Sequence, residues 1–206
     1  MDEKLLLKVL ELSVPVLAGG MVALLAERVG RWMFSPTVRV DFDSSENPAY
    51  FAITPEGGTK QGNMSAWVRV RVRNIRGATA RGCRGYLAKV EEWDENERKF
   101  KQGWYFDISQ LAWSSRLNLA YDPVDLPRGI DQFLDVVSSR GYTAHPQFRV
   151  ETQFKPLREI ALGMEKGLFR FTIVVAGDNF KPRTFQLRYR WTGRWQAPEV
   201  SAASPN

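Results

Sequence analysis

The sequence has little of the side-chain chemistry from which active sites and metal centres are commonly built. Cys83 is the only cysteine and His145 the only histidine among 206 residues. A lone cysteine excludes an intrachain disulfide and favours a reducing compartment. A zinc site needs several cysteine or histidine ligands at set spacings, and these two residues cannot supply them. We therefore expect no bound metal and no cofactor.

Catalytic motifs are also missing. His145 has Asp135, Ser138 and Ser139 nearby in the sequence, but a Ser-His-Asp triad seldom draws its members from neighbouring positions. No G-x-S-x-G nucleophile elbow is present. The glycines of residues 56–62 lack the Lys-Ser/Thr ending of a phosphate-binding loop. We predict that the protein is not an enzyme and that His145 is a solvated loop residue.

One acidic cluster could suggest calcium. Asp94, Glu95 and Glu97 lie close together in DENERKFK, residues 94–101. No EF-hand pattern surrounds them, so we interpret the stretch as a charged, solvated hairpin tip or loop.

Cys83 lies between Arg81 and Arg84, and neighbouring cations can favour a reactive thiolate. Alternation along a strand would point Cys83 away from both guanidinium groups, however. We therefore expect a buried core thiol.

Long apolar runs are absent apart from one, LLLKVLELSVPVLAGGMVALLA, at residues 5–26. As a helix it would span roughly 33 Å, enough to cross the hydrocarbon core of a bilayer. Lys8 and Glu11 are three residues apart and can share one helix face. Trp32 and Phe34 follow the run, where an aromatic belt would lie. We predict that residues 1–35 contain a single-pass membrane anchor.

The alternatives for residues 5–26 are a cleaved signal peptide and an amphipathic surface helix. The chain begins Met-Asp-Glu-Lys, which is not a basic start, and Leu24 disrupts a cleavage site ending at Ala26. Residues 12–26 carry no charge and offer almost no polar face. Both alternatives are therefore less favoured than an anchor.

Basic residues flank the run on both sides, so charge alone does not fix its orientation. With a single cysteine in the chain, we predict that the following domain faces the cytoplasm. Small side chains on the run would allow close helix–helix contact and homo-oligomers. This predicted contact comprises Ala18, Gly19, Gly20 and Ala23; the alternative is a helix that faces lipid only.

The remainder of the chain predicts a mainly β domain. Residues 37–42, 67–73, 169–175 and 184–191 alternate apolar and polar side chains with period two. Turn sequences separate them, and residues 74–81 are expected to make a turn and a crossing. We predict an antiparallel β-sandwich of seven to nine strands over residues 36–196, followed by a flexible tail, 197–206.

Two segments carry a family resemblance. VRVRVRNIRGATARGCRGYL, residues 68–87, resembles the second-strand region of immunoglobulin-like adhesion and interaction domains, and GLFRFTIVVAGDN, residues 167–179, is similar to their late strand and turn. With the anchor, the layout resembles uncharacterised prokaryotic proteins that join one N-terminal membrane helix to one such sandwich. The resemblance implies a fold and an anchor, but no activity and no catalytic residues. The cysteine pair of antibody domains is absent.

Arginines line the polar faces of two predicted strands. If both strands belong to one sheet, their guanidinium groups form an anion-binding surface, namely Arg69, Arg71, Arg73, Arg188 and Arg190. The alternative is that acidic cross-strand partners, such as Glu91, neutralise these side chains. Nucleic acid is an unlikely ligand, because only Trp67 adds an aromatic ring for stacking.

The net charge of +6 favours anionic neighbours, including membrane lipids. Taken together, the sequence predicts a membrane-anchored interaction or accessory protein that docks a protein partner or membrane complex. The alternative is a binding module for anionic lipid headgroups or nucleic acid.

Overall fold

The computed structural model describes residues 29–30, 34–43, 49–55, 64–102, 108–114, 116, 120–140, 147–153 and 166–203. The chain divides into two compact units, Met1–Ser35 and Pro36–Asn206. The predicted anchor and its small residues Ala18, Gly19, Gly20 and Ala23 lie outside the described residues, as does His145. Within the described ranges, no helix has the length and apolar character needed to cross a membrane.

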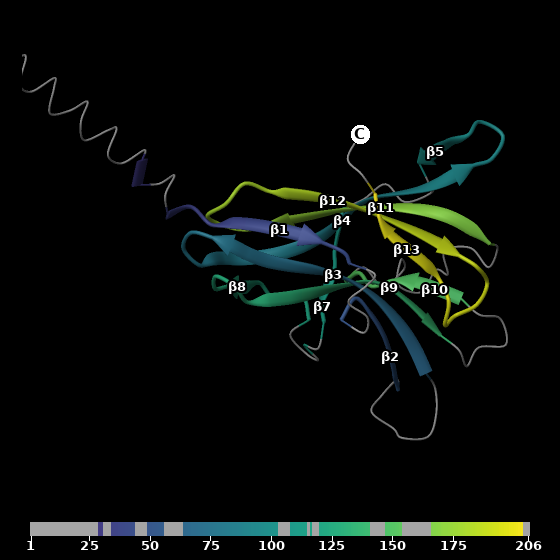
Figure 1. The fold of residues 1–206 in the computed structure, drawn as a ribbon, viewed down its shortest axis with the longest axis horizontal. Helices are drawn as coiled ribbons and strands as arrows, with labels where there is room; N and C mark the ends of the chain where they lie inside the picture. Colours follow the sequence, from purple (N-terminus) through teal and green to yellow (C-terminus); the bar gives the residue numbers. More distant parts are fainter. Residues whose placement is uncertain are drawn as a thin grey trace, which may run out of the picture. The chain divides into compact units, whose positions relative to one another are not determined.

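The second unit is built from two antiparallel sheets that pack face to face (Figure 1). The six-stranded first sheet is centred on β3 and β9, with β1 and β2 along the outer edge of β3 and β7 and β10 along that of β9. Its strands are β1 (Thr37–Asp41), β2 (Phe51–Pro55), β3 (Met64–Arg76), β7 (Ala112–Trp113), β9 (Asp131–Arg140) and β10 (Gln147–Val150).

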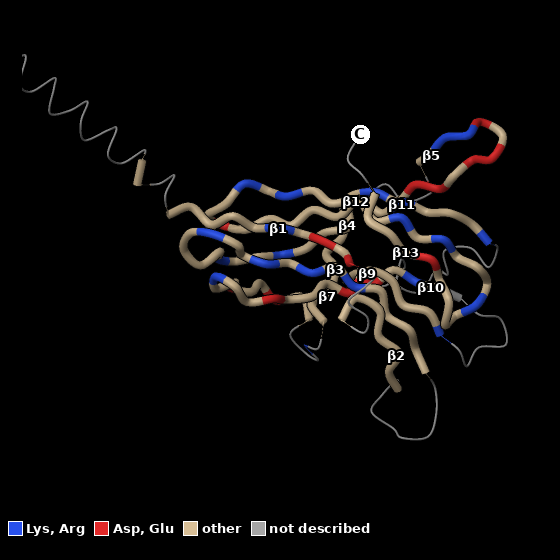
Figure 2. The backbone as a smooth tube through the Cα atoms, viewed as in Figure 1, with Lys and Arg blue, Asp and Glu red and all other residues tan. Residues whose placement is uncertain are grey.

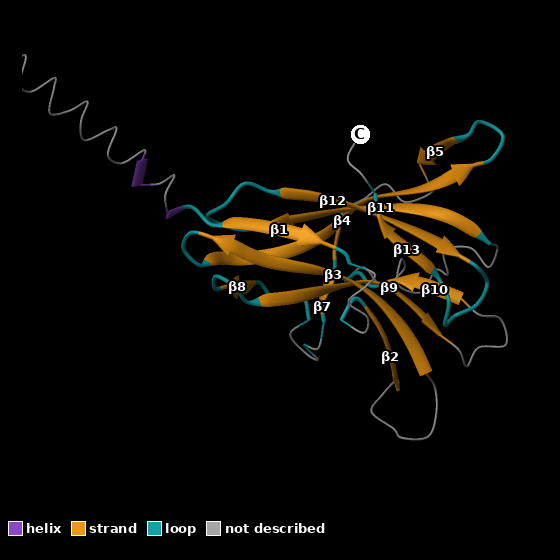
Figure 3. Cartoon of the chain, viewed as in Figure 1, coloured by secondary structure: helices purple, strands orange, loops and turns teal. Residues whose placement is uncertain are grey.

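The seven-stranded second sheet runs in the order β13-β12-β11-β4 (Figure 3). Three short strands, β8, β6 and β5, pair in turn with successive parts of the other edge of β4. The strands are β4 (Ala80–Asp94), β5 (Lys99–Gln102), β6 (Ser109–Gln110), β8 (Val124–Leu126), β11 (Gly167–Ala176), β12 (Arg183–Trp191) and β13 (Glu199–Ala202).

The period-two pattern determines which side chains fill the space between the sheets. In β3 the valines Val68, Val70 and Val72 are buried, as predicted, while the arginines between them point to the outer face. In β11 and β12 the buried positions alternate in the same way. A half-buried antiparallel strand requires this alternation. The prediction of a mainly β, sandwich-like fold is confirmed.

Two β-bulges keep apolar residues in the core where the sequence breaks the alternation. Leu87 and Val90 are three positions apart, so a regular strand would place them on opposite faces. The register of β4 against β11 shifts at this point and leaves Ala88 without a partner, so that both side chains are buried. The register of β9 against β3 shifts in the same way at Val136, between Leu134 and Val137.

The turn from β3 to β4 carries the chain from one sheet to the other, as the predicted crossing requires. The side chain of Asn74 is fully buried there and donates to the carbonyl oxygens of Ala78 and Leu126. Gly82 adopts a positive φ of 61°, and a Cβ at this position would clash with the carboxylate of Asp178. The turn is thus stabilised by the side-chain hydrogen bonds of Asn74 and by the absence of a side chain at Gly82.

Two expectations about this unit were wrong. The segment predicted as a flexible tail, 197–206, contains β13, because Val200 pairs opposite Tyr189 and the Ala203 N–H donates to the Gln186 carbonyl. The described strands also exceed the seven to nine predicted. Strands of two or three residues, such as β6, β7 and β8, are too short to show an alternating pattern in the sequence.

Replacing Ile173 with Asp places an unpaired carboxylate in the core, where Ile173 is fully buried. We expect the free energy of unfolding to fall by at least about 4 kcal/mol, measured by denaturant titration. The matched control is Thr172→Asp, one position along β11 on the outer face, which should change stability by about 1 kcal/mol or less. Equal effects of the two substitutions would contradict the facing of β11.

Candidate functional site

The five arginines of the predicted anion-binding surface are divided between the two sheets. Arg69, Arg71 and Arg73 lie on the outer face of β3, in the first sheet, whereas Arg188 and Arg190 lie on the outer face of β12, in the second. The two outer faces point away from each other. The structure therefore does not bring the five side chains together, and the single-surface arrangement is wrong.

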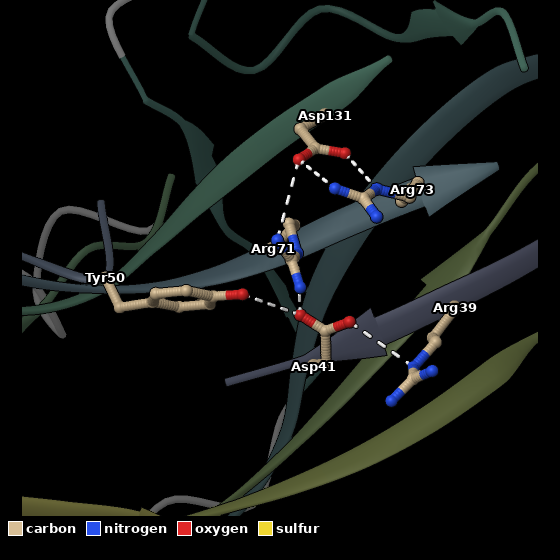
Figure 4. A network of polar contacts seen from close by, with 6 residues as sticks. All are labelled: Arg39, Asp41, Tyr50, Arg71, Arg73 and Asp131. Carbon is tan, nitrogen blue, oxygen red and sulfur yellow. Dashed lines mark hydrogen bonds and ion pairs between the residues drawn. The ribbon is translucent and has the colours of Figure 1, made fainter. Parts of the chain in front are cut away.

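The arginines near the end of β3 belong to a polar network on the outer face of the first sheet (Figure 4). Arg71 Nε donates to Asp41 Oδ1 at 2.8 Å, and its Nη1 lies 3.7 Å from Asp131 Oδ2. Arg73 donates hydrogen bonds to Asp131 from both Nε and Nη2. Two further residues bind Asp41, so that the Arg–Asp network comprises Arg39, Asp41, Tyr50, Arg71, Arg73 and Asp131.

Aromatic packing supports this network from one side. Tyr50 is 1% exposed, and its hydroxyl donates to Asp41 Oδ1 at 2.9 Å. Its ring meets Phe42 and Phe133 edge to face, at centroid distances of 5.3 and 5.7 Å. The Arg71 guanidinium lies 5.4 Å from the centre of the same ring. Arg71 therefore contacts the Tyr50 ring with its guanidinium, and both residues bind the same Asp41 carboxylate. These contacts fix the positions of the charged groups.

Arg69 has its own carboxylate. Its Nε donates to Asp135 Oδ1 at 2.8 Å, in a largely buried setting. Burial raises the pKa of Asp135, and the nearby Glu151 charge adds to that rise, while Arg69 acts to lower the pKa. Arg69, Arg71 and Arg73 are all paired with aspartates of the same domain. The alternative of neutralisation by acidic partners thus holds for β3.

The residues weighed for a catalytic triad also have structural partners. The Ser138 hydroxyl donates to Glu151 Oε1, and the Ser139 hydroxyl donates to the Trp195 carbonyl at 2.7 Å. Asp135 accepts from Arg69. These contacts link β9 with the residue after β10, with the segment after β12 and with β3, respectively.

On the outer face of the second sheet, cations outnumber carboxylates. Arg170 binds Glu91 with two hydrogen bonds, of 2.7 and 2.9 Å, and Arg188 lies directly opposite Arg170. Arg190 has an exposed ion pair with Glu199 at 3.3 Å. Within the described ranges Arg188 has no carboxylate partner.

Cys83 is fully buried, and its thiol contacts the Ala80 carbonyl. Burial raises the pKa of the thiol to about 12, and the charges of Asp125 and Asp178 add to the rise. A thiol with so high a pKa is neutral at physiological pH and a poor nucleophile. The prediction of a buried core thiol is confirmed.

The acidic cluster near residue 95 is also paired. Lys101 binds both Asp94 and Glu97, and Lys99 binds Glu97 at 2.6 Å. The pKa of Asp94 falls to about 2, chiefly because of the hydrogen bond from Lys101.

These charged residues form the end of the hairpin between β4 and β5, a stretch predicted only as a charged hairpin tip or loop. Pairing of β4 with β11 ends at Glu92, and beyond it β4 pairs only with β5, so the hairpin projects from the sheet as an arm (Figure 1). On the arm, Trp93 and Phe100 pack edge to face at 5.2 Å, and both are half-buried. The Arg170 guanidinium lies 4.3 Å from the Phe100 ring centre. We call Trp93, Phe100 and Arg170 the arm patch.

The sequence shows an aromatic residue on each side of the charged stretch, but only the register of β4 against β5 places the two opposite each other. Trp93 and Phe100 flank the charged tip and face each other only when the hairpin places them in opposite positions. Arg170 joins them from β11, seventy residues beyond Phe100, and its pairing with Glu91 brings it there.

Comparison with known proteins adds no family to this description: no family model matches the chain, and neither the curated proteins nor the solved structures include a significantly similar one.

The Arg–Asp network predicts an acid-dependent stability. The hydrogen bond from Arg73 lowers the pKa of Asp131 below its ordinary value of 3.8. A carboxylate whose pKa is lowered by folding stabilises the folded state above pH 3.8, and this contribution is lost as the pH falls through the lowered pKa. Asp131→Asn should therefore lower the Tm near pH 7, and the Tm values of variant and wild type should converge below pH 3.8.

The control for this measurement is Asp122→Asn, an exposed aspartate outside the network. It should leave the Tm close to that of the wild type at both pH values. A Tm difference between Asp131→Asn and wild type that persists unchanged at low pH would show that the ionised carboxylate is not what stabilises the network.

Proposed function

We propose that this protein is a membrane-anchored β-sandwich that docks a protein partner at the membrane surface, without catalytic activity of its own. The arm patch carries this proposal. It combines an aromatic pair with an arginine on a hairpin that projects beyond its sheet. Trp, Tyr and Arg are enriched among the residues that dominate the free energy of protein–protein binding.

The arm patch is organised before any partner binds. Glu91 is nearly fully buried and fixes Arg170 with two hydrogen bonds, while Lys89 binds the same carboxylate at 2.7 Å. Burial acts to raise the pKa of Glu91, but the hydrogen bonds from Arg170 and Lys89 outweigh it and lower the pKa. A preformed patch loses less conformational entropy on association, which favours affinity. The ion pairs at the tip restrain the far end of the arm in the same way.

The proposal takes the apolar run of residues 5–26 as the anchor and the sandwich as immunoglobulin-like. The two facing antiparallel sheets support an immunoglobulin-like relationship, although Cys83 has no second cysteine with which to form the disulfide of antibody domains. The length and apolar character of the run support the anchor. An accessory subunit of a membrane complex fits this layout.

The partner-docking role is tested by a pull-down of the full-length chain from detergent-solubilised native membranes, with captured proteins identified by mass spectrometry. Trp93→Ala should reduce capture of the specific partner by about tenfold or more, because truncating an aromatic hot spot costs about 2 kcal/mol. Ile108→Ala is the matched control, since Ile108 is 70% exposed and precedes β6, which pairs with Tyr86 and Leu87 rather than with the arm. A captured protein that both variants retain equally would speak against docking on the arm.

The anchor is tested on membranes from expressing cells. Washing with alkaline carbonate should leave the full chain in the membrane pellet, whereas a chain that lacks residues 1–35 should appear in the supernatant. Full-length protein in the supernatant would contradict the anchor. The comparison is informative only if both chains are expressed in folded form, which intrinsic tryptophan fluorescence can report.

A further inference from the structure

Three loops converge at the end of the sandwich where β1 begins. These are the turn from β3 to β4, the segment between β8 and β9, and the turn from β11 to β12. The Asn179 side chain accepts from the Arg81 N–H and donates to the Thr79 carbonyl, which joins the first loop to the third. The Gly129 N–H donates to the Asn74 carbonyl and so joins the second loop to the end of β3.

These loops present exposed cations. Arg81, Arg128, Lys181 and Arg183 are all exposed, and within the part of the chain that the structure describes none of them pairs with a carboxylate. Figure 2 shows basic stretches in the loops at this end. Two exposed isoleucines, Ile75 at 44% and Ile130 at 49%, lie beside them. We call these six residues the basic end.

The carboxylates nearby have other roles. Asp125 accepts a hydrogen bond from the Gly82 N–H at 2.9 Å. Asp178 lies against Gly82, which must lack a side chain for this contact, and the Asp178 N–H donates to the Arg81 carbonyl. The Asp125 carboxylate therefore stabilises the loop backbone, and Asp178 is held against the same loop through its own N–H. The guanidinium and ammonium groups around them stay directed to solvent.

The position of the basic end in the chain points to its partner. Thr37, the first residue of β1, pairs with Arg76 at the end of β3, so the chain enters the domain at this end. Ten residues separate the apolar run that ends at Ala26 from Thr37. If that run is the anchor, as proposed above, the basic end is the part of the sandwich closest to the bilayer along the chain.

We infer that the basic end docks on an anionic bilayer surface, with the cations at the headgroups and Ile75 and Ile130 at the boundary with the acyl chains. Lysine and arginine near an anionic leaflet each favour binding, and the attraction fades over a Debye length of about 8 Å. Exposed aliphatic side chains beside cations match a bilayer surface, where charged headgroups lie above apolar acyl chains. Nucleic acid fits less well, because Phe180, the aromatic residue of these loops, is half-buried against the core.

The inference differs from the predicted basic sheet face. Arg69, Arg71 and Arg73 are bound by aspartates, whereas the cations of the basic end have no carboxylate partner among the residues that the structure describes. It rests on the proposed anchor for the direction in which the domain faces. Its chemistry, however, belongs to the loops alone and can be tested apart from the anchor.

The test uses the full chain in lipid nanodiscs, either neutral phosphatidylcholine or phosphatidylcholine with phosphatidylserine. Cys83→Ala removes the native thiol, and a fluorophore is attached through Ala78→Cys, in the turn from β3 to β4. Nitroxide-labelled headgroups then report proximity by quenching. A second probe, attached through Asn96→Cys at the tip of the arm, serves as the distant reference.

We expect quenching of the probe at position 78 in anionic discs, a weaker effect in neutral discs, and release as salt rises. Replacing Arg81, Arg128, Lys181 and Arg183 together with Gln should abolish the difference between the lipids. A control with the same loss of charge is Arg98, Lys166, Arg188 and Arg194 to Gln, at exposed sites elsewhere, which should retain it. Quenching that is equal in both lipids, or unaffected by the four changes in the basic end, would overturn the inference.

Failure of the anchor gives a different result, since the chain would then not be incorporated into neutral nanodiscs. In that case the same chain is sedimented with preformed vesicles. Binding to anionic vesicles that falls by at least about tenfold in the basic-end variant, and not in the control, still supports the inference, because each cation near the surface changes partitioning by about fivefold. Absence of vesicle binding overturns it, and so does binding of an RNA oligonucleotide in place of vesicles.

Discussion

The apolar layer between the two sheets is the constraint on which the rest of the domain depends. Each long strand contributes every second side chain to this layer, so the residues between them must lie on an outer face. In β3 the layer takes Val68, Val70 and Val72 and leaves three arginines outside. Where a strand lacks strict alternation, as at Leu87 and Val90 in β4, a bulge restores the burial. The core thus determines which positions of each strand face outward, including those of the three β3 arginines.

Charges placed in this way on neighbouring strands need compensation, because like charges opposite each other on a sheet are unfavourable. The first sheet provides it with aspartates of β1 and β9, which pair with the arginines of β3. Tyr50 and its aromatic neighbours partly shield the network from water. The arginines on this face therefore link β3 to β1 and β9 through ion pairs. The second sheet compensates less completely, and Arg170 with Glu91 there supports the arm instead.

The two proposed surfaces lie at opposite ends of β4. Its beginning, at Ala80 and Arg81, belongs to the loops of the basic end, and its final residues form the arm. A single fifteen-residue strand therefore links the candidate lipid surface with the candidate protein surface.

The sequence by itself determined the alternating strands, their buried faces, the buried thiol of Cys83 and the absence of a recognisable catalytic motif. These properties are local, because the period of a strand and the chemistry of a turn can be read from neighbouring residues. Pairing across the chain was decided by the tertiary structure. Only the register of β3 against β1 and β9 shows that Arg71 and Arg73 have aspartate partners. Only the assignment of β3 and β12 to different sheets separates arginines that alternate in the same way. The basic end likewise arises from three loops that are distant in sequence. They meet because the antiparallel strands that they connect begin or finish at the same end of the sandwich.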